Sequence, residues 1–491
     1  MIASQPTAAL PGHASSGSKN KSAALVSKAV TVFLWLLFII NLSFLIWNFR
    51  AIPVWTLGDF LHFNGFTVLI WTTVTFFSAV VSSYASNYLT GFKYHSKFML
   101  YCLGFTFTVL LLVVSNHIFL LLASWMLMGV FMSGLIGIDS RWGEAKRASR
   151  FALSYFLTGT LFLSIGLLLL AFYSGVFTIY DLPEVIFDIP LYIVIPAALC
   201  VIMAAIVQSA MYPFHRWLLS AMTSPTPASA LMHAGFVNGA GILLALFATL
   251  LFASETLTIL FVIGGFTAIL AQFTKLLQVN VKQKLACSTI AQMGFMIMQC
   301  GLGFFNAAVV HLILHGFYKA YLFLSSGEEI LQTKPQKIKK LKIKPLQAFV
   351  VLLFGSLGAF LFAEWTGKEM TDSGVFLTLI VAITVGQATY NIVKERSLNT
   401  VQKIIVPPLL FLSGIGIYAL MYNGVTILMG DMPMVAQSIP LSGVQVTFGI
   451  IFLLGFFIMK LGVYRKIPWL YVKLMNISQP YDKSVLMYRT K

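Results

Sequence analysis

Long apolar runs recur along this chain, and they constrain its fold more than any other feature. They extend from Thr31 to Leu461, and many are close to the roughly 20 residues that an α-helix needs to cross the core of a bilayer. Of the 491 residues, 59% are hydrophobic and only 10% are charged, whereas a soluble domain carries about 25% charged residues. The sequence therefore predicts an all-α polytopic membrane protein rather than a large soluble helical core.

The distribution of basic residues tests the number of helices. Lys and Arg concentrate in the cytoplasmic loops of membrane proteins, and here they follow even-numbered helices, as in KPQKIKKLKIK from Lys334 to Lys344. This pattern places both termini in the cytoplasm, and it explains the net charge of +17 without nucleic-acid binding. We expect about fourteen transmembrane helices, centred near residues 38, 76, 106, 126, 162, 200, 240, 267, 293, 315, 357, 384, 413 and 455.

The sequence lacks the patterns that support redox, metal or nucleotide chemistry. Its four cysteines stand singly in apolar segments and form no CxxC pair, and no Gly-rich fingerprint precedes a helix. We therefore expect this chain to hold no cofactor or metal and to be no enzyme. Residues 1–28 are polar and rich in Ser, Ala and Lys, so we expect them to form a disordered basic cytoplasmic tail.

The sixth apolar run is longer than one helix needs. It extends from Ile189 to Met222, Pro213 interrupts it, and the segment SPTPAS with Pro225 and Pro227 follows. Proline kinks or breaks a helix, and backbone groups freed at membrane depth must face protein or a water-filled cavity. Discontinuous helices of this kind mark ion and substrate paths. The alternative is an ordinary re-entrant connection.

Glu364 is the one acidic residue that we expect well inside an apolar run. A charged side chain at the bilayer centre costs about 2.5 kcal/mol or more, so its position needs a reason. Lys368 follows four residues later with Glu369 beside it, which places Glu364 and Lys368 on one helix face in the favourable order. The pair is either a static internal salt bridge or a switchable gate for ions, and the sequence leaves both interpretations open.

A polar stripe lies on the tenth expected helix. His311, His315 and Lys319 fall at i, i+4 and i+8 of VVHLILHGFYKAYLFLSSG, so they share one face of an otherwise apolar helix. Imidazole takes up and releases protons near neutral pH, and a desolvated lysine can join such a relay. The spacing favours a proton path over inert packing.

His233 follows the SPTPAS segment, within ASALMHAGFVNGAG. The small residues around it permit close approach of a neighbouring helix. We consider His233 a further candidate for the ion path. The alternative is a packing motif with a buried histidine.

Three blocks of sequence carry a resemblance to a known family. They read QSAMYPFHRWLLSAMTSPTPASALMHAG, LLQVNVKQKLACSTIAQMGF and HLILHGFYKAYLFLSSG. The chain resembles the antiporter-like subunits of respiratory complex I and of multisubunit cation/proton antiporters, over roughly residues 65–370. Within that superfamily, HAGFVNGAG and HGFYKAYLFLSSG are most similar to DabB, the family of membrane subunits of bacterial complexes that accumulate dissolved inorganic carbon.

The resemblance implies two inverted five-helix repeats, each with one broken helix. By motif match, the stripe takes the place of the central relay, Lys368 that of the relay lysine on the second broken helix, and His233 that of the histidine after the first break. The implied segments are N-terminal transmembrane helices at 29–95, a first repeat at 98–253, a second repeat at 256–394, C-terminal transmembrane helices at 404–465 and a cytoplasmic tail at 466–491.

Two positions depart from the family pattern. Complex I subunits carry a WE motif on an early repeat helix, whereas here Trp125 is followed by Met126. They also carry a lysine where this chain has Gln208. The Glu/Lys pair of the first repeat is therefore absent, so any ion path is expected to use the second-repeat stripe.

The resemblance also implies a function and a partner. The chain would conduct a cation, proton or sodium, across a bacterial inner membrane. The gradient would drive hydration of carbon dioxide by a DabA-like, zinc-binding partner similar to β-carbonic anhydrases. The alternative is a subunit of a multisubunit cation/proton antiporter, of respiratory complex I or of a membrane hydrogenase. Fold alone does not decide between them.

Overall fold

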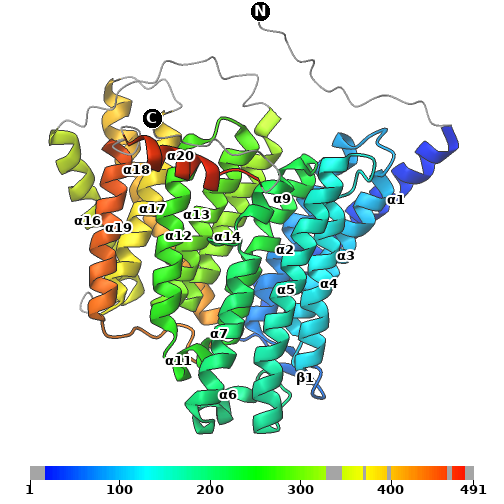
Figure 1. Ribbon diagram of the computed structural model, residues 1–491, viewed down its shortest axis with the longest axis horizontal. Coiled ribbons are helices and arrows are strands. Elements are labelled where there is room, and N and C mark those ends of the chain that lie inside the picture. The colour runs from blue at the N-terminus through cyan, green and yellow to red at the C-terminus, as the bar shows by residue number, and fades with distance from the viewer. Residues whose placement is uncertain (1–16, 328–344, 369–371, 395–399, 462–466, 481–491) are drawn as a thin grey trace, which may run out of the picture.

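The structure, a computed structural model, describes residues 17–327, 345–368, 372–394, 400–461 and 467–480. Its helices run side by side in one bundle, and α1 leans away from the rest (Figure 1). A short antiparallel hairpin of β1 (Trp55–Leu57) and β2 (Leu61–Phe63) lies at the lower end of the bundle (Figure 1). It is the one sheet in the described parts of the chain.

The long helices follow the apolar runs of the sequence. In chain order they are α1 (Gly17–Asn48), α2 (Gly65–Tyr88), α3 (His95–Val114), α4 (Ile118–Ile136), α5 (Gly143–Ser174), α7 (Leu191–Gln208), α12 (Leu257–Leu277), α13 (Val281–Gly301), α14 (Phe305–Leu324), α16 (Pro345–Thr366), α17 (Gly374–Lys394), α18 (Thr400–Leu428) and α19 (Gly443–Leu461).

Short helices complete the bundle. They are α6 (Leu182–Val185), η1 (Ile186–Asp188), α8 (Arg216–Ser220), η2 (Ala221–Thr223), α9 (Thr226–Ala234), η3 (Phe236–Asn238), α10 (Gly239–Leu246), α11 (Ala248–Ala253) and α20 (Pro468–Ile477).

The helices are apolar enough for a multi-pass membrane protein. Within the described residues, ten helices are long and apolar enough to cross a membrane. Each of the expected centres lies in a helix, but ten qualifying helices do not confirm the expected number of about fourteen.

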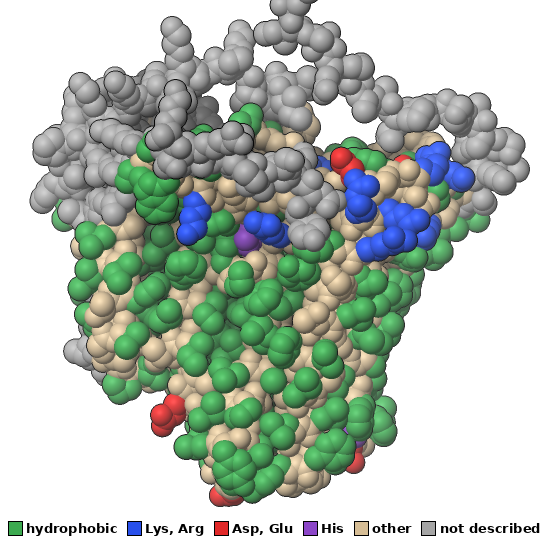
Figure 2. All heavy atoms as spheres, in the orientation of Figure 1, with side chains coloured by type: hydrophobic (Ala, Val, Ile, Leu, Met, Phe, Trp, Pro, Cys, Tyr) green, Lys and Arg blue, Asp and Glu red, His purple; other side chains and the backbone are tan. Residues whose placement is uncertain are grey.

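Charge is concentrated at the two ends of the bundle (Figure 2). On the visible face, Lys and Arg gather at the upper end, Asp and Glu lie mainly at the lower end, and apolar side chains cover the band between them. The beginning of α1 and the whole of α20 lie at the upper end (Figure 1). This is the arrangement that a bilayer around the apolar band would impose.

The two expected tails differ from the structure. Residues 1–16 of the first tail lie outside the described residues. α1 already begins at Gly17, so residues 17–28 are helical rather than disordered as expected. The expected C-terminal tail at 466–491 contains α20, whose Leu474 packs against Leu277 of α12. A run of apolar residues every three to four positions explains why this segment folds back onto the bundle.

The break in the sixth apolar run is present. α7 ends at Gln208, residues 209–215 are not helical, and α8 begins at Arg216. Pro213 therefore lies in the break, as expected. Pro225 and Pro227 instead stand at the start of α9, because proline fits the first turn of a helix, where the missing N–H has no intrahelical partner.

The sequence reading missed a second interruption. α9 ends at Ala234, the backbone of its C-cap Gly235 leaves the helical region, and a single 3₁₀ turn leads into α10. By contrast, α16 is continuous from Pro345 to Thr366.

Candidate ion path

Three basic side chains line one face of α14, as the sequence predicted. His311 and His315 are 4% and 5% exposed, and Lys319 is fully buried. Residues four apart lie one above the other on a helix, so the three groups form a continuous polar stripe through protein rather than along lipid. Burial of three such groups is costly without partners, so their surroundings determine what the stripe can do.

Lys319 has a backbone partner. Its Nζ donates a hydrogen bond to the carbonyl oxygen of Leu285 on α13, at 3.0 Å. No carboxylate of the described residues forms an ion pair with Lys319. An amine held by a neutral acceptor gives up its proton more readily than one held by a carboxylate.

His233 lies on α9, the helix that packs against the stripe-bearing helix α14. α9 packs against α14, and the His233 ring stacks on that of Phe323 with centroids 4.3 Å apart. Lys319 lies close enough to act electrostatically on both His233 and His315. We call His233, His311, His315 and Lys319 the basic cluster.

The imidazoles of the basic cluster have open hydrogen-bonding positions. Both ring nitrogens of His233 and of His315 are buried and have no protein partner within the described structure. Buried polar groups are nearly always hydrogen-bonded to protein or to ordered water. These nitrogens are therefore the positions at which internal water or a transferred proton would bind.

Close packing holds α9 and α14 in register. A Cβ added at Gly316 would lie 2.5 Å from the Phe77 ring of α2 and 3.0 Å from the carbonyl oxygen of Ala234, so this close approach depends on the missing side chain. Asn238 adds a polar link, because its Nδ2 donates to the carbonyl oxygens of Ala234 at 2.8 Å and of Leu312 at 3.2 Å. The α9 interruption thus places its backbone against the histidine-bearing helix.

The predicted Glu364–Lys368 ion pair is not present. Glu364 lies on the last turn of α16 with its side chain exposed, and Lys368 follows the helix end. The Lys368 Nζ instead lies 4.5 Å from the ring centroid of Phe304. Burial lowers the pKa of Lys368, and the carboxylate of Asp372 acts in the opposite direction. Glu369 lies outside the described residues.

The two departures from the family pattern differ in their surroundings. Gln208 is buried, and its Nε2 donates to the carbonyl oxygen of Phe236 at 3.2 Å. This uncharged side chain is therefore hydrogen-bonded to the turn between α9 and α10. Met126 is 39% exposed, on the outer side of α4, while Trp125 beside it is buried. Neither position supplies a charge to the first repeat.

Sequence reasoning missed one lysine near the basic cluster. Lys282 is the second residue of α13, and its Nζ donates to the carbonyl oxygen of Ser224 at 2.7 Å. It also acts electrostatically on His233. A lysine at the start of a membrane helix normally indicates only the topology of the loop before it. No sequence pattern distinguishes it from its neighbour Lys284.

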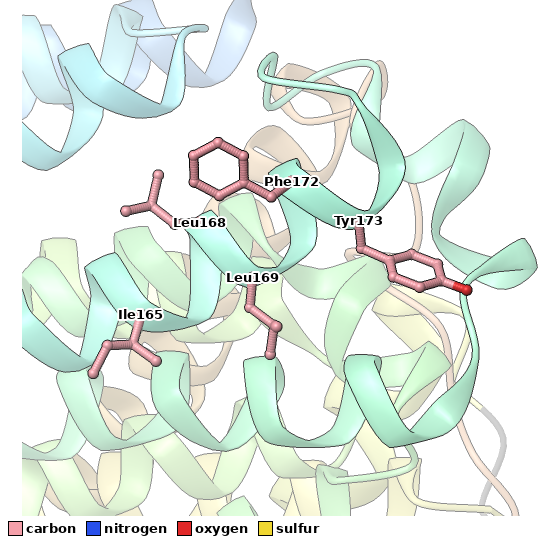
Figure 3. Close-up of a pocket in the computed structure, with 5 residues that line it drawn as sticks. All are labelled: Ile165, Leu168, Leu169, Phe172 and Tyr173. Atoms are coloured by element: carbon pink, nitrogen blue, oxygen red, sulfur yellow. The ribbon is translucent and has the colours of Figure 1, made fainter.

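A surface hollow lies apart from the stripe residues. It has a volume of about 480 Å³ and is lined by Ile165, Leu168, Leu169, Phe172 and Tyr173, all from α5 (Figure 3). These side chains are almost entirely apolar and the hollow is open, so it fits a lipid-facing groove rather than an ion site.

A family profile matches the part of the chain that holds the basic cluster. The family is described as NADH:quinone oxidoreductase/Mrp antiporter, TM, and the match covers residues 115–349. This range includes α9, α13 and α14 in full. Residues 115–349, a little under half of the chain, therefore match this family of antiporter-like membrane subunits, and the resemblance predicted from the sequence is confirmed.

Individual curated proteins are also similar to this chain. The chain is similar to the probable inorganic carbon transporter subunit DabB1 of Halothiobacillus neapolitanus, with 34% identity over 317 residues, or 61% of this chain and 56% of the relative. It is also similar to the NADH-ubiquinone oxidoreductase chain 5 of Cryphonectria parasitica, with 30% identity over 356 residues, or 70% of this chain and 52% of the relative. The chain thus spans about half the length of these curated relatives.

A solved structure supports the fold. One chain of the Mrp complex from Dietzia sp. DQ12-45-1b superposes with a TM-score of 0.56 at 19% identity, covering 96% of this chain and 54% of that one. The all-α membrane fold of the Mrp and complex I type is therefore confirmed.

Proposed function

We propose that this chain is the cation-conducting membrane subunit of an energy-coupled inorganic carbon pump in the bacterial inner membrane. The observation that carries this proposal is the basic cluster, buried inside a module whose relatives include inorganic carbon transporter subunits. Its imidazoles pass protons along α14, and Lys319 accepts or releases one at the end of the stripe. Lys368, near the end of α16, serves as a further relay group.

Catalysis takes place in a partner subunit. A DabA-like, zinc-binding subunit similar to β-carbonic anhydrases hydrates carbon dioxide, and the cation flowing down its gradient through this chain makes that hydration effectively one-way. This chain orients and moves protons and holds no cofactor of its own. Its basic end faces the cytoplasm, which places the beginning of α1 and α20 on that side (Figure 1).

A specific observation keeps a second function open. The match to NADH-ubiquinone oxidoreductase chain 5 covers 70% of this chain, so a subunit of complex I, of a membrane hydrogenase or of a multisubunit cation/proton antiporter is the alternative. Met126 and Gln208 favour the carbon pump, because they replace the Glu/Lys pair that those machines use in the first repeat.

Co-purification and growth distinguish the two functions. A large zinc-binding partner that co-purifies with the tagged chain supports the carbon pump, whereas several small membrane subunits support the alternative. Expression of both pump subunits should rescue a carbonic-anhydrase-deficient strain at ambient carbon dioxide. Lys319→Ala or His311→Ala should abolish rescue while the partner still co-purifies, and Lys284→Ala, on the exposed side of α13, should rescue normally. Normal rescue by Lys319→Ala and His311→Ala would contradict the proposed path.

A further inference from the structure

A left-handed turn at the end of α16 fixes the position of Lys368. Gly367 follows the last helical residue with a φ of +64°, in the left-handed region that glycine adopts without strain. The N–H of Lys368 then donates to the carbonyl oxygen of Ala363 at 3.0 Å, the long bond that closes a Schellman turn. This turn satisfies a carbonyl group at the helix end and sets where the lysine backbone lies.

Two aromatic rings receive the ammonium group of Lys368. Its Nζ lies 4.5 Å from the ring centroid of Phe304 and 5.5 Å from that of Tyr422. Both distances are within about 6 Å, the range over which an aromatic face attracts a cation. Phe304 is the N-cap residue of α14, and Tyr422 lies on α18. We call Phe304 and Tyr422 the aromatic pair, which joins the end of α16 to two other helices.

Packing and backbone bonds hold the aromatic pair in place. Both residues are buried. The N–H of Phe304 donates to the carbonyl oxygen of Gln299 at 3.0 Å, and the Tyr422 ring packs edge-on against Phe362 of α16 with centroids 5.7 Å apart. Rings that are already fixed lose little freedom when they receive a cation, so the aromatic pair is preorganised for the lysine.

The rings occupy the position that a carboxylate would take in an ion pair. No carboxylate of the described residues forms an ion pair with Lys368, although Glu364 precedes it by four positions. The carboxylate of Asp372, whose charge also acts on Lys368, accepts a hydrogen bond from the N–H of Gly374 at 2.6 Å. A paired carboxylate strongly favours the protonated amine, whereas an aromatic face attracts it more weakly. The aromatic pair thus positions the lysine without fixing its charge.

We propose that Phe304 and Tyr422 are positioning residues for Lys368, whose ammonium they hold at the end of α16 so that it can receive a proton and pass it on. This inference rests on the proposed function, in which Lys368 is a relay group. It adds α18, which lies outside both expected repeats, to the helices that form the ion path. The aromatic pair itself transfers no proton.

The chemical reactivity of the Lys368 amine tests the contact by itself. The full complex in detergent is treated with an amine-acylating reagent, and modification of Lys368 is followed by mass spectrometry. In Tyr422→Leu the rate should rise about threefold or more, since loss of a cation–π contact frees the amine. Tyr422→Phe keeps the ring and should keep the wild-type rate. Tyr418→Leu is the matched control, because Tyr418 packs on the same Phe362 but is not one of the rings around Lys368.

Proton flux through the complex in liposomes, followed with a pH-sensitive dye, tests the role in the path. Per assembled complex, Tyr422→Leu should lower flux about threefold or more, and Tyr422→Phe should restore it. Unchanged labelling in Tyr422→Leu, or an equal rise in Tyr418→Leu, would overturn the contact. Faster labelling with normal flux would overturn the positioning role. Tyr422→Met replaces Tyr422→Leu if that variant does not assemble. A wild-type complex that passes no protons overturns the proposed function, whereas the labelling result still decides the contact.

Discussion

The Nζ of Lys319 lies 3.0 Å from the carbonyl oxygen of Leu285, and this bond joins the histidine-bearing helix α14 to α13. The side chain is fully buried. Because its partner is a neutral oxygen, the lysine is held in place in either protonation state, since a neutral amine can still donate that hydrogen bond. The bond therefore fixes the position of the amine without fixing its charge, which is what a relay group requires.

His315 should be dispensable for stability and necessary for flux. Both of its ring nitrogens are buried without a protein partner, so His315→Leu removes an unsatisfied polar group and should change the free energy of unfolding by no more than about 1 kcal/mol. Proton flux should nevertheless fall to background. Thermal unfolding in detergent measures the first effect, and liposome flux the second. A large loss of stability would show that His315 is a structural residue.

Asn238 should stabilise the interruption between α9 and α10. Its Nδ2 donates to the carbonyl oxygens of Ala234 and Leu312, so Asn238→Leu leaves two buried acceptors without that donor. We expect a loss of about 1–3 kcal/mol, measured as the midpoint shift in detergent unfolding. Asn423→Leu is the control, because that exposed side chain bonds only to the carbonyl oxygen of Trp365. Equal effects of the two variants would contradict the assignment.

The contact between α12 and α13 depends on two glycines that face each other. A Cβ at Gly294 would lie 2.7 Å from both the Ala268 backbone nitrogen and the Gly264 carbonyl oxygen. Gly294→Ala should therefore force the helices apart and cost about 1–3 kcal/mol, visible as reduced yield and a lower unfolding temperature. Gly355→Ala, on α16, has open space for its methyl group and should be tolerated. Normal stability of Gly294→Ala would show that this contact is looser than described.

His215 should make the docking of α20 depend on pH. Its Nε2 lies 2.7 Å from the carbonyl oxygen of Ile477, and burial lowers its pKa from the usual 6.5 to about 4. A lowered histidine pKa means that the unfolded state binds the proton more strongly. The stabilisation is therefore complete above about pH 6.5 and is lost as the pH falls towards 4.

Hydrogen exchange of the α20 amides measures this effect. Protection should decrease between about pH 6.5 and 4 in the wild type. In His215→Gln the protection should not change over that interval, apart from the intrinsic change in exchange rate. Protection that falls equally in both proteins would mean that another group controls α20.

The polar stripe could be predicted from the sequence because it depends only on residue spacing within one helix. Residues at i, i+4 and i+8 share a helix face wherever that helix is placed, so His311, His315 and Lys319 could be grouped without tertiary information. The interruption at Pro213 was equally visible, since proline acts on its own helix. That His233 lies against the stripe depended on the packing of α9 on α14, and only the resemblance to a family indicated it.

The errors occurred where tertiary structure decides. Glu364 and Lys368 satisfy the helical spacing, but α16 ends at Thr366, so the two residues do not share a helix. Lys282 was missed because its bond to Ser224 joins segments far apart in the chain. Likewise, α20 was taken for part of a tail, since a short apolar helix reveals its partner only after the bundle forms.

Proton flux through the reconstituted complex with Lys319→Arg tests the central claim most directly. Arginine keeps the positive charge and the hydrogen-bonding capacity but does not release a proton in proteins. If the basic cluster conducts protons, flux should fall at least about tenfold, or 1.4 kcal/mol or more in the barrier, while the partner remains bound and Lys284→Arg behaves as wild type. Wild-type flux in Lys319→Arg would contradict the account, because conduction would then not need a lysine that changes its protonation state.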